Sequence, residues 1–386
     1  MYEKNNNLLH NRKKIDLESF SAKIVFEGDS THLPRMNPGW MESCLSSNLD
    51  QSCQTNPVLF EPSSPLFDDL KAKSLATQHQ VDAVITADAF EVLLQRPGYQ
   101  TTRWCVPTSC ESLETKNIKR SHSKKTHKRI TFLDDPIPTS LTPRQCVSYG
   151  MKNEFCSKIL CPSIKSLKEK QHVYTLLEIP KSTERSSLKL LVRSTNVFND
   201  ELDHPIKLRG QLEYFPERGF EEFTAHERAV WIMEKMIQPA CRIVVARMDP
   251  NTGKLLKLEE KSAAHSLATN QSGYELLSVV SNISSVDLEM HFQCVADVII
   301  GTMKVESTGN HMICLPGRDI SSSANACVSV HRALRNISKE APVIDVFNEL
   351  NEARNVFLEK RFLLNCFRRW QWDQDRLPYT FPYRIE

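Results

Sequence analysis

Four side chains have a spacing that could bind zinc. Cys105 and Cys110 precede His122 and His127 in the arrangement C-x4-C-x11-H-x4-H. Two thiolates and two imidazoles at such a spacing can complete a tetrahedral zinc site. The intervening segment, ESLETKNIKRS, has no aromatic side chain to pack the small core of a zinc finger. We therefore keep zinc binding as an alternative, and we expect no metal or other cofactor.

A second stretch could bind phosphate. Residues 251–255 read NTGKL, but a phosphate loop needs the pattern G-x-x-x-x-G-K-[ST]. Met248 stands at the first glycine position, and Leu255 stands where a hydroxyl is required. The sequence DPNTG at 249–253 lies between two apolar runs and is typical of a tight turn. We therefore predict a β-hairpin here and no nucleotide loop.

Histidines are the remaining candidates for catalysis. His226 and His331 could act as bases, but neither has a nucleophile near it in sequence, and such catalysis needs a positioned partner. The chain has no nucleophile elbow, HExxH, GxGxxG or kinase motif. We predict a protein that is not an enzyme and has no catalytic residues. An enzyme with a dispersed active site stays as an alternative.

A basic run extends over residues 116–129, KNIKRSHSKKTHKR, and contains no acidic residue. Such runs serve as nuclear import signals or contact phosphate backbones, and some are only solvated linkers. We favour nuclear import, because few aromatic residues are interleaved for base stacking. The basic residues of this arm are Lys116, Lys119, Arg120, Lys124, Lys125, Lys128 and Arg129.

The C-terminal segment RRWQWDQDRLPYTFPYR is rich in aromatic residues and prolines. Large aromatic side chains often dominate the energetics of protein interfaces. We predict that this segment either packs against its own domain or contacts another subunit. The residues of this possible partner interface are Trp370, Trp372, Tyr379 and Phe381.

The first 170 residues are rich in Ser, Thr, Asn and Pro and show little periodicity, so we expect a mostly disordered arm. The exception is a short strand–helix element near 81–96, in which Thr86 would cap the helix; we expect it to be a docking element. Twelve cysteines without an export signal indicate reduced thiols in the cytosol or nucleus. No apolar run reaches the length of about 18 residues needed to cross a membrane.

Residues 171–386 show regular patterns and predict a single α+β domain. A capping box of Thr224 and Glu227 begins a helix that Pro239 ends. The other expected elements are strands at 172–180, 187–194, 207–215, 311–317 and 326–334, helices at 273–283 and 286–303, and a partly helical segment at 343–372.

Residues 205–386 resemble the C-terminal domain family of little elongation complex subunit 2, also called NMDA receptor-regulated protein 2. Several weak motifs in order carry the resemblance, including QLEYF, the capped helix, the hairpin and the tail RLPYTFP. The matching positions are Leu212, Glu213, Tyr214, Gly219, Glu221, Thr224, Glu227, Trp231, Asp249, Thr252, Lys254, Leu255, Leu256, Glu259, Arg332, Ala333, Pro378, Thr380, Phe381 and Pro382.

This resemblance implies a non-enzymatic scaffold subunit of a nuclear transcription elongation complex. Such a subunit would support transcription of small nuclear RNA genes by RNA polymerase II. Its partners would be other subunits of the complex, with no membrane partner and with direct nucleic-acid contact left open. The alternative from the residues is a nucleic-acid-binding protein that uses the basic arm and the possible zinc site.

Overall fold

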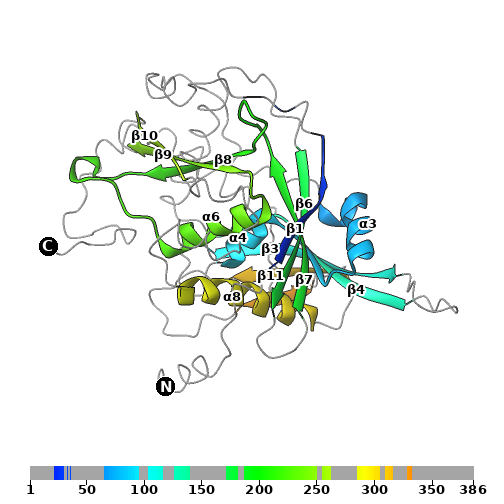
Figure 1. The fold of residues 1–386 in the computed structure, drawn as a ribbon. Helices are drawn as coiled ribbons and strands as arrows, with labels where there is room; N and C mark the ends of the chain where they lie inside the picture. The colour runs from blue at the N-terminus through cyan, green and yellow to red at the C-terminus, as the bar shows by residue number, and fades with distance from the viewer. Residues whose placement is uncertain are drawn as a thin grey trace, which may run out of the picture.

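The computed structural model describes residues 21–29, 33, 35, 65–94, 103–115, 126–139, 171–180, 187–249, 254–261, 285–304, 309–315 and 328–332. They form a mixed fold with many strands and few helices, which confirms the predicted α+β class (Figure 1). The strands are β1 (Ser21–Glu27), β2 (Ala83–Thr86), β3 (Arg103–Thr115), β4 (Thr126–Leu133), β5 (Ile137–Thr139), β6 (Gln171–Pro180), β7 (Ser187–Asn196), β8 (Ile206–Leu212), β9 (Arg242–Asp249), β10 (Lys254–Glu260), β11 (Gly309–Leu315) and β12 (Ser329–Arg332). The helices are η2 (Leu66–Asp68), α3 (Leu70–His79), α4 (Ala87–Leu94), η3 (Pro216–Arg218), α6 (Ala225–Ile237) and α8 (Ser285–Met303).

A nine-stranded sheet takes its strands from both sides of residue 170. The order is β1-β6-β7-β2-β4-β3-β11-β12, with β5 paired to β3. The short strand β2 runs parallel to both β4 and β7 and lies in the middle of the sheet. The expected division into an arm up to residue 170 and a separate domain is therefore not how the sheet is built. The strand–helix element near 81–96 is confirmed as β2 and α4, but it is central to the fold and not a docking element.

The sheet has helices on both faces, and the alternation of its side chains explains why. Ala83 and Ile85 of β2 belong to the main apolar core, in which α4, α6 and α8 also pack. Val84, which points the other way, lies in a second core with α3. Because successive side chains of a strand point to opposite faces, a continuous apolar strand such as β2 must be covered on both sides. No helix in the described residues is long and apolar enough to cross a membrane.

A second sheet contains three strands in the order β10-β9-β8. Strands β8 and β9 are parallel and are connected through α6, whereas β9 and β10 are antiparallel. The predicted hairpin is therefore confirmed, although its turn residues 250–253 lie outside the described residues. Helix α6 begins with the predicted capping box: the Glu227 amide donates to the Thr224 hydroxyl at 3.2 Å, and the Thr224 amide donates to the Glu227 carboxylate at 2.7 Å.

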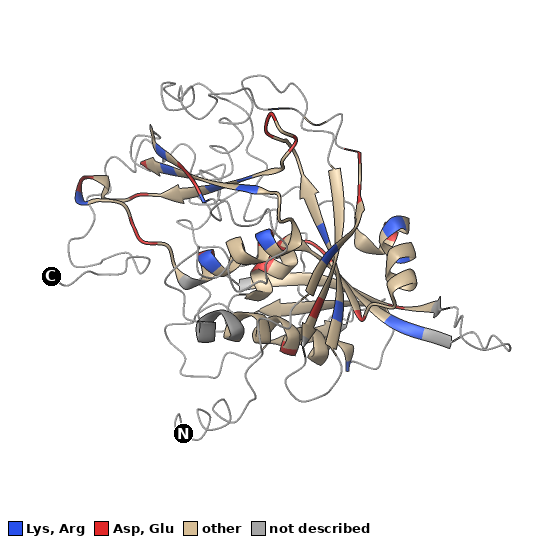
Figure 2. Ribbon diagram, in the orientation of Figure 1, with Lys and Arg blue, Asp and Glu red and all other residues tan. Residues whose placement is uncertain are grey.

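Charged residues are distributed unevenly between the two sheets. The nine-stranded sheet is mostly uncharged, whereas Lys, Arg, Asp and Glu recur along β8, β9, β10 and α6 (Figure 2). One pair in this region is almost completely buried: the side chain of Arg247 is 4% exposed and that of its partner Glu213 is 1% exposed. Arg247 also donates to Glu259 at 3.1 Å, and its guanidinium stacks over the ring of Phe223.

The C-terminal predictions are tested only in part. The helix expected at 286–303 is confirmed as α8, with Phe292, Val295 and Ile299 buried. The strands expected at 311–317 and 326–334 are confirmed as β11 and the shorter β12. The helix expected at 273–283 and the segment 343–372 lie outside the described residues. So do all four residues of the possible partner interface, Trp370, Trp372, Tyr379 and Phe381.

Candidate functional site

The two cysteines of the possible zinc site do not face a common point. Cys105 and Cys110 lie five positions apart in the regular strand β3, so their side chains point to opposite faces. The Cys105 thiol lies beside Cys314, and the Cys110 thiol lies beside the Thr131 hydroxyl. His122 is outside the described residues, and no group of three or more His, Cys, Asp or Glu within them could hold a metal ion. The spacing match is therefore explained by chance placement in a strand.

The neighbour of Cys105 leads to a testable expectation. Cys105 and Cys314 are directly opposite each other on antiparallel β3 and β11, with 3.4 Å between their sulfur atoms. Diamide treatment of the folded protein should therefore link them as a disulfide. Peptide mapping without reductant should recover the linked pair, and a Cys314→Ser variant should lose it. Recovery of a Cys105–Cys110 link from folded protein would contradict this arrangement.

The basic run is only partly an exposed arm. Residues 116–125 lie outside the described residues, but Lys128 and Arg129 belong to β4. Lys128 forms an ion pair with Asp82 at 3.0 Å, and Arg129 donates to the backbone carbonyl of Met303. These two residues therefore connect β4 to its neighbours. Strand β4 begins at Thr126, inside the run that the composition predicted to be an exposed arm.

The two histidines considered as bases are found in different places. His226, in α6, is nearly buried beside His291, and burial lowers its pKa to about 3, so the ring is neutral at ordinary pH. His331, in β12, contacts the Ser329 hydroxyl at 2.9 Å. Neither residue lines the pocket described next.

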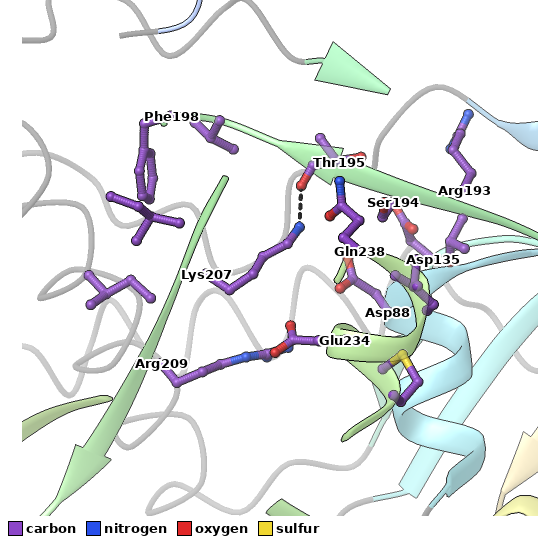
Figure 3. Close-up of a pocket in the computed structure, with 17 residues that line it drawn as sticks. Asp88, Asp135, Arg193, Ser194, Thr195, Phe198, Lys207, Arg209, Glu234 and Gln238 are labelled. Atoms are coloured by element: carbon purple, nitrogen blue, oxygen red, sulfur yellow. Dashed lines mark hydrogen bonds and ion pairs between the residues drawn. The ribbon is translucent and has the colours of Figure 1, made fainter. Parts of the chain in front are cut away.

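A pocket of about 250 Å³ lies between the two sheets (Figure 3). Its walls come from the start of α4, the end of β7, the strand β8 and the end of α6, with Asp135 after β4. Four elements that are far apart in the sequence therefore meet here. The volume is slightly below the range of about 300–1,000 Å³ typical of small-molecule sites, which suits the terminal group of a larger ligand.

Lys207 is the cation of this pocket that remains available to a ligand. It lies on β8, is half-buried, and donates from Nζ to the Thr195 carbonyl oxygen at 2.7 Å (Figure 3). Within the part of the chain that the structure describes, it forms no ion pair. A carbonyl group neutralises none of its charge, so Lys207 can attract an anion into the pocket.

Asp88 is the carboxyl group with the environment best suited to proton transfer. It lies in the first turn of α4, where Thr86 caps the helix by accepting from the Ala89 amide at 3.1 Å. The side chain lines the pocket and is exposed at its surface, although the chain packed around it removes part of its hydration. Burial raises the pKa of Asp88, and the charge of Asp135 raises it further, while Arg209 and Lys207 oppose the shift. A raised carboxyl pKa near a pocket is typical of acid–base groups.

Arg209 is the second cation on β8, and two carboxylates occupy it. Its Nη2 atom lies 2.8 Å from Glu91 Oε2 of α4 and also contacts Glu234 Oε1 of α6. The other oxygen of Glu234, Oε2, is buried and has no hydrogen-bond partner among the described residues. Burial raises the pKa of Glu91, and Arg209 opposes this shift. The three side chains form what we call the Arg209 bridge, between Glu91 and Glu234.

The sequence contains signals for these residues. Lys207 and Arg209 alternate with apolar residues in a strand, so both project to the same face. Glu91 and Glu234 each interrupt an apolar helical run, in AFEVLL and WIMEKMI. An acidic residue inside such a run requires a partner, because an unpaired buried charge is costly.

Comparison with known proteins gives only structural matches. No protein-family model matches the chain, and no curated protein matches it. The fold is similar to a crystal structure of S. pombe Rai1, with a TM-score of 0.50 and 11% identity over 84% of this chain and 98% of that one. Two further similar structures are K. lactis Dxo1 in complex with manganese (TM-score 0.40, 9% identity, 85% and 94% coverage) and Scheffersomyces stipitis Rai1 in complex with (3′-NADP)+ and calcium ion (TM-score 0.45, 10% identity, 89% and 98% coverage).

These matches correct the functional predictions from the sequence. The resemblance to little elongation complex subunit 2 is wrong, because the fold is that of Rai1. The similarity to Rai1, an RNA-processing enzyme, also contradicts the expected non-enzymatic scaffold serving small nuclear RNA transcription by RNA polymerase II. Two of the weak motifs that carried the resemblance, the capped helix and the hairpin, occur in many folds.

A divalent cation is the group to test against this pocket, because carboxylate oxygens are the usual ligands of such ions. The Arg209 bridge, to which the pocket residue Glu234 belongs, does not fit one. Glu91 and Glu234 both bind Arg209 Nη2, which places a guanidinium nitrogen where a metal ion would have to lie between them. The described residues also contain no group of three or more possible ligands.

Proposed function

We propose that the chain is an enzyme that hydrolyses a phosphate bond at the 5′ end of RNA in the pocket between the two sheets. The observation that carries the proposal is the pairing of Lys207, a cation without an ion pair among the described residues, with Asp88, a carboxyl group with a raised pKa, in one pocket. The similarity to S. pombe Rai1, an RNA-processing protein, supports RNA as the substrate class.

The chemistry assigns a separate role to each group. Hydrolysis of a phosphate bond requires a site for the anionic phosphoryl group and a group that exchanges a proton with the attacking water or the leaving oxygen. Lys207 would hold the phosphate, because its half-buried ammonium forms no ion pair among the described residues. Asp88 would exchange the proton.

A nuclear location accompanies this proposal. Rai1 and Dxo1 are nuclear RNA-processing proteins, and a nucleus is compatible with the basic run of this chain. We assign import to Lys119, Arg120, Lys124 and Lys125. Lys128 and Arg129 are left out, because both already have partners in the sheet.

The proposal is tested with RNA oligonucleotides that share a sequence and differ at the 5′ end. The ends to compare are hydroxyl, monophosphate, triphosphate and a dinucleotide cap. Mass spectrometry should show product from an end that contains a phosphoanhydride and none from the hydroxyl end. The absence of product from all four ends, with folded protein and added divalent cations, would overturn the proposal.

Variants assign the activity to the pocket. Asp88→Asn should lower kcat by about 10²–10⁴-fold, the usual contribution of a positioned acid–base group. Lys207→Ala should lower kcat/KM by roughly 10- to 100-fold, because a charged hydrogen bond contributes about 1.5–3 kcal/mol. Lys257→Ala is the matched control: this lysine is half-exposed on β10, outside the pocket, and its loss should leave the rate unchanged. Equal losses in the control would show that the pocket is not the site.

A further inference from the structure

The Arg209 bridge has a geometry that a hydrogen-bonded ion pair does not require. Both carboxylates contact the same nitrogen, Nη2. Elsewhere in the chain, Arg242 also binds two carboxylates, but Asp200 contacts Nη1 and Glu260 contacts Nη2 and Nε. Convergence of two carboxylate oxygens on a single positive point is the arrangement in which proteins bind divalent cations.

The position of the bridge reinforces this reading. Glu91 comes from α4 and Glu234 from α6, and Asp88 lies one helical turn before Glu91 on α4. Charge from Glu234, Glu91 and Asp88 raises the pKa of Arg209, so the guanidinium keeps its proton. Without Arg209, Glu91 and Glu234 would face each other with no counter-charge between them, and the two helices would repel each other.

We propose that Arg209 is the built-in cation of this pocket, taking the place between Glu91 and Glu234 that a divalent ion would otherwise take. The pocket then needs no divalent cation to hold its two helices together. For the hydrolysis proposed above, on which this step rests, Arg209 makes turnover independent of a divalent cation. Arg209 is thus a positioning residue, which holds α4 and therefore Asp88 in place.

The inference predicts that removal of Arg209 creates a metal site. Arg209→Ala should lower the melting temperature, because two carboxylates lose their counter-charge. Mn²⁺ should then raise the melting temperature of this variant by at least about 3 °C at saturating concentration, since a ligand that binds only the folded state stabilises it. The melting temperature of the wild-type protein should show no saturable rise with Mn²⁺ that the Glu234→Gln substitution removes.

Two further variants control this measurement. Arg209→Ala combined with Glu91→Gln and Glu234→Gln has the same cavity without the anionic ligands, and it should not respond to Mn²⁺. Arg209→Lys keeps a positive charge between the helices and should also not respond. If Arg209→Ala does not fold even with Mn²⁺ present, the titrations of the wild-type protein and of Arg209→Lys decide the matter. A rise in the melting temperature of either protein with Mn²⁺ overturns the proposal if Glu234→Gln abolishes that rise.

The outcomes separate this inference from the proposed function. A folded Arg209→Ala variant that fails to bind Mn²⁺ overturns the inference, whatever the activity. Loss of wild-type turnover in EDTA, restored by Mn²⁺ or Mg²⁺, also overturns it. A lack of turnover under every condition, together with Mn²⁺ binding by Arg209→Ala only, sinks the proposed hydrolysis and supports the built-in cation.

Discussion

Residues 171–386 expressed alone should not fold. The missing half supplies β2, β4 and β3, which fill the centre of the nine-stranded sheet between β7 and β11. It also supplies α4, whose Phe90 is fully buried and meets Phe292 of α8 edge-on at 5.9 Å between ring centroids. The fragment would expose the main core, so thermal unfolding should show no cooperative transition and proteolysis should be rapid.

Two controls sharpen this prediction. The full chain under the same conditions should unfold cooperatively. Residues 1–170 supplied as a second chain should restore a transition, because the strands pair with each other and not through the covalent connection. A point variant gives the same test at smaller scale: Phe90→Ala should lower the free energy of unfolding by about 3–5 kcal/mol. A fragment 171–386 with a sharp transition of its own would show that the sheet is two separate units.

Arg247→Ala should lower the free energy of unfolding by about 3–5 kcal/mol, because it leaves Glu213 buried with its charge uncompensated. Glu213 keeps one contact, the hydrogen bond that its Oε2 accepts from the Glu221 amide at 2.9 Å. That contact cannot replace the lost guanidinium. Chemical denaturation monitored by circular dichroism measures the change.

Matched variants separate charge from packing in this pair. Arg247→Met with Glu213→Leu replaces both partners by apolar groups and should recover most of the loss, as replaced buried ion pairs often do. Arg35→Ala removes a pair with Asp203 in which both side chains are about half exposed, and should cost less than about 1 kcal/mol. A loss at Arg35 as large as that at Arg247 would mean that burial does not set the cost.

Local signals predicted the elements that depend on local chemistry. The hairpin of β9 and β10 followed from its turn residues, and helix α6 from its capping box. The strand–helix element at 81–96 followed from a run of apolar residues and a threonine cap. In each case the hydrogen bonds that define the element are made between residues close together in the chain, so composition and spacing are sufficient.

Strands β3 and β4 were missed because their stabilisation is not local. Their sequences, RWCVPTSCESLET and THKRITFL, contain Thr, Ser, Pro and several charges, which is the composition of a loop. The strands form because β3 pairs with β11 on one side and with β4 on the other. The pocket was missed for the same reason, since Asp88, Lys207 and Glu234 meet only after two sheets have assembled.

The pairing of β3 with β11 has a consequence for synthesis of the chain. Cys105 and Cys314, which face each other in that pairing, are separated by 209 positions. At a translation rate of about 5–20 residues per second, the ribosome needs roughly 10–40 s to make the intervening chain. During that time β3 has an edge without its final neighbour, and folding dominated by such distant pairings is slow. Nascent chains of this protein should therefore depend on chaperones until β11 has left the ribosome.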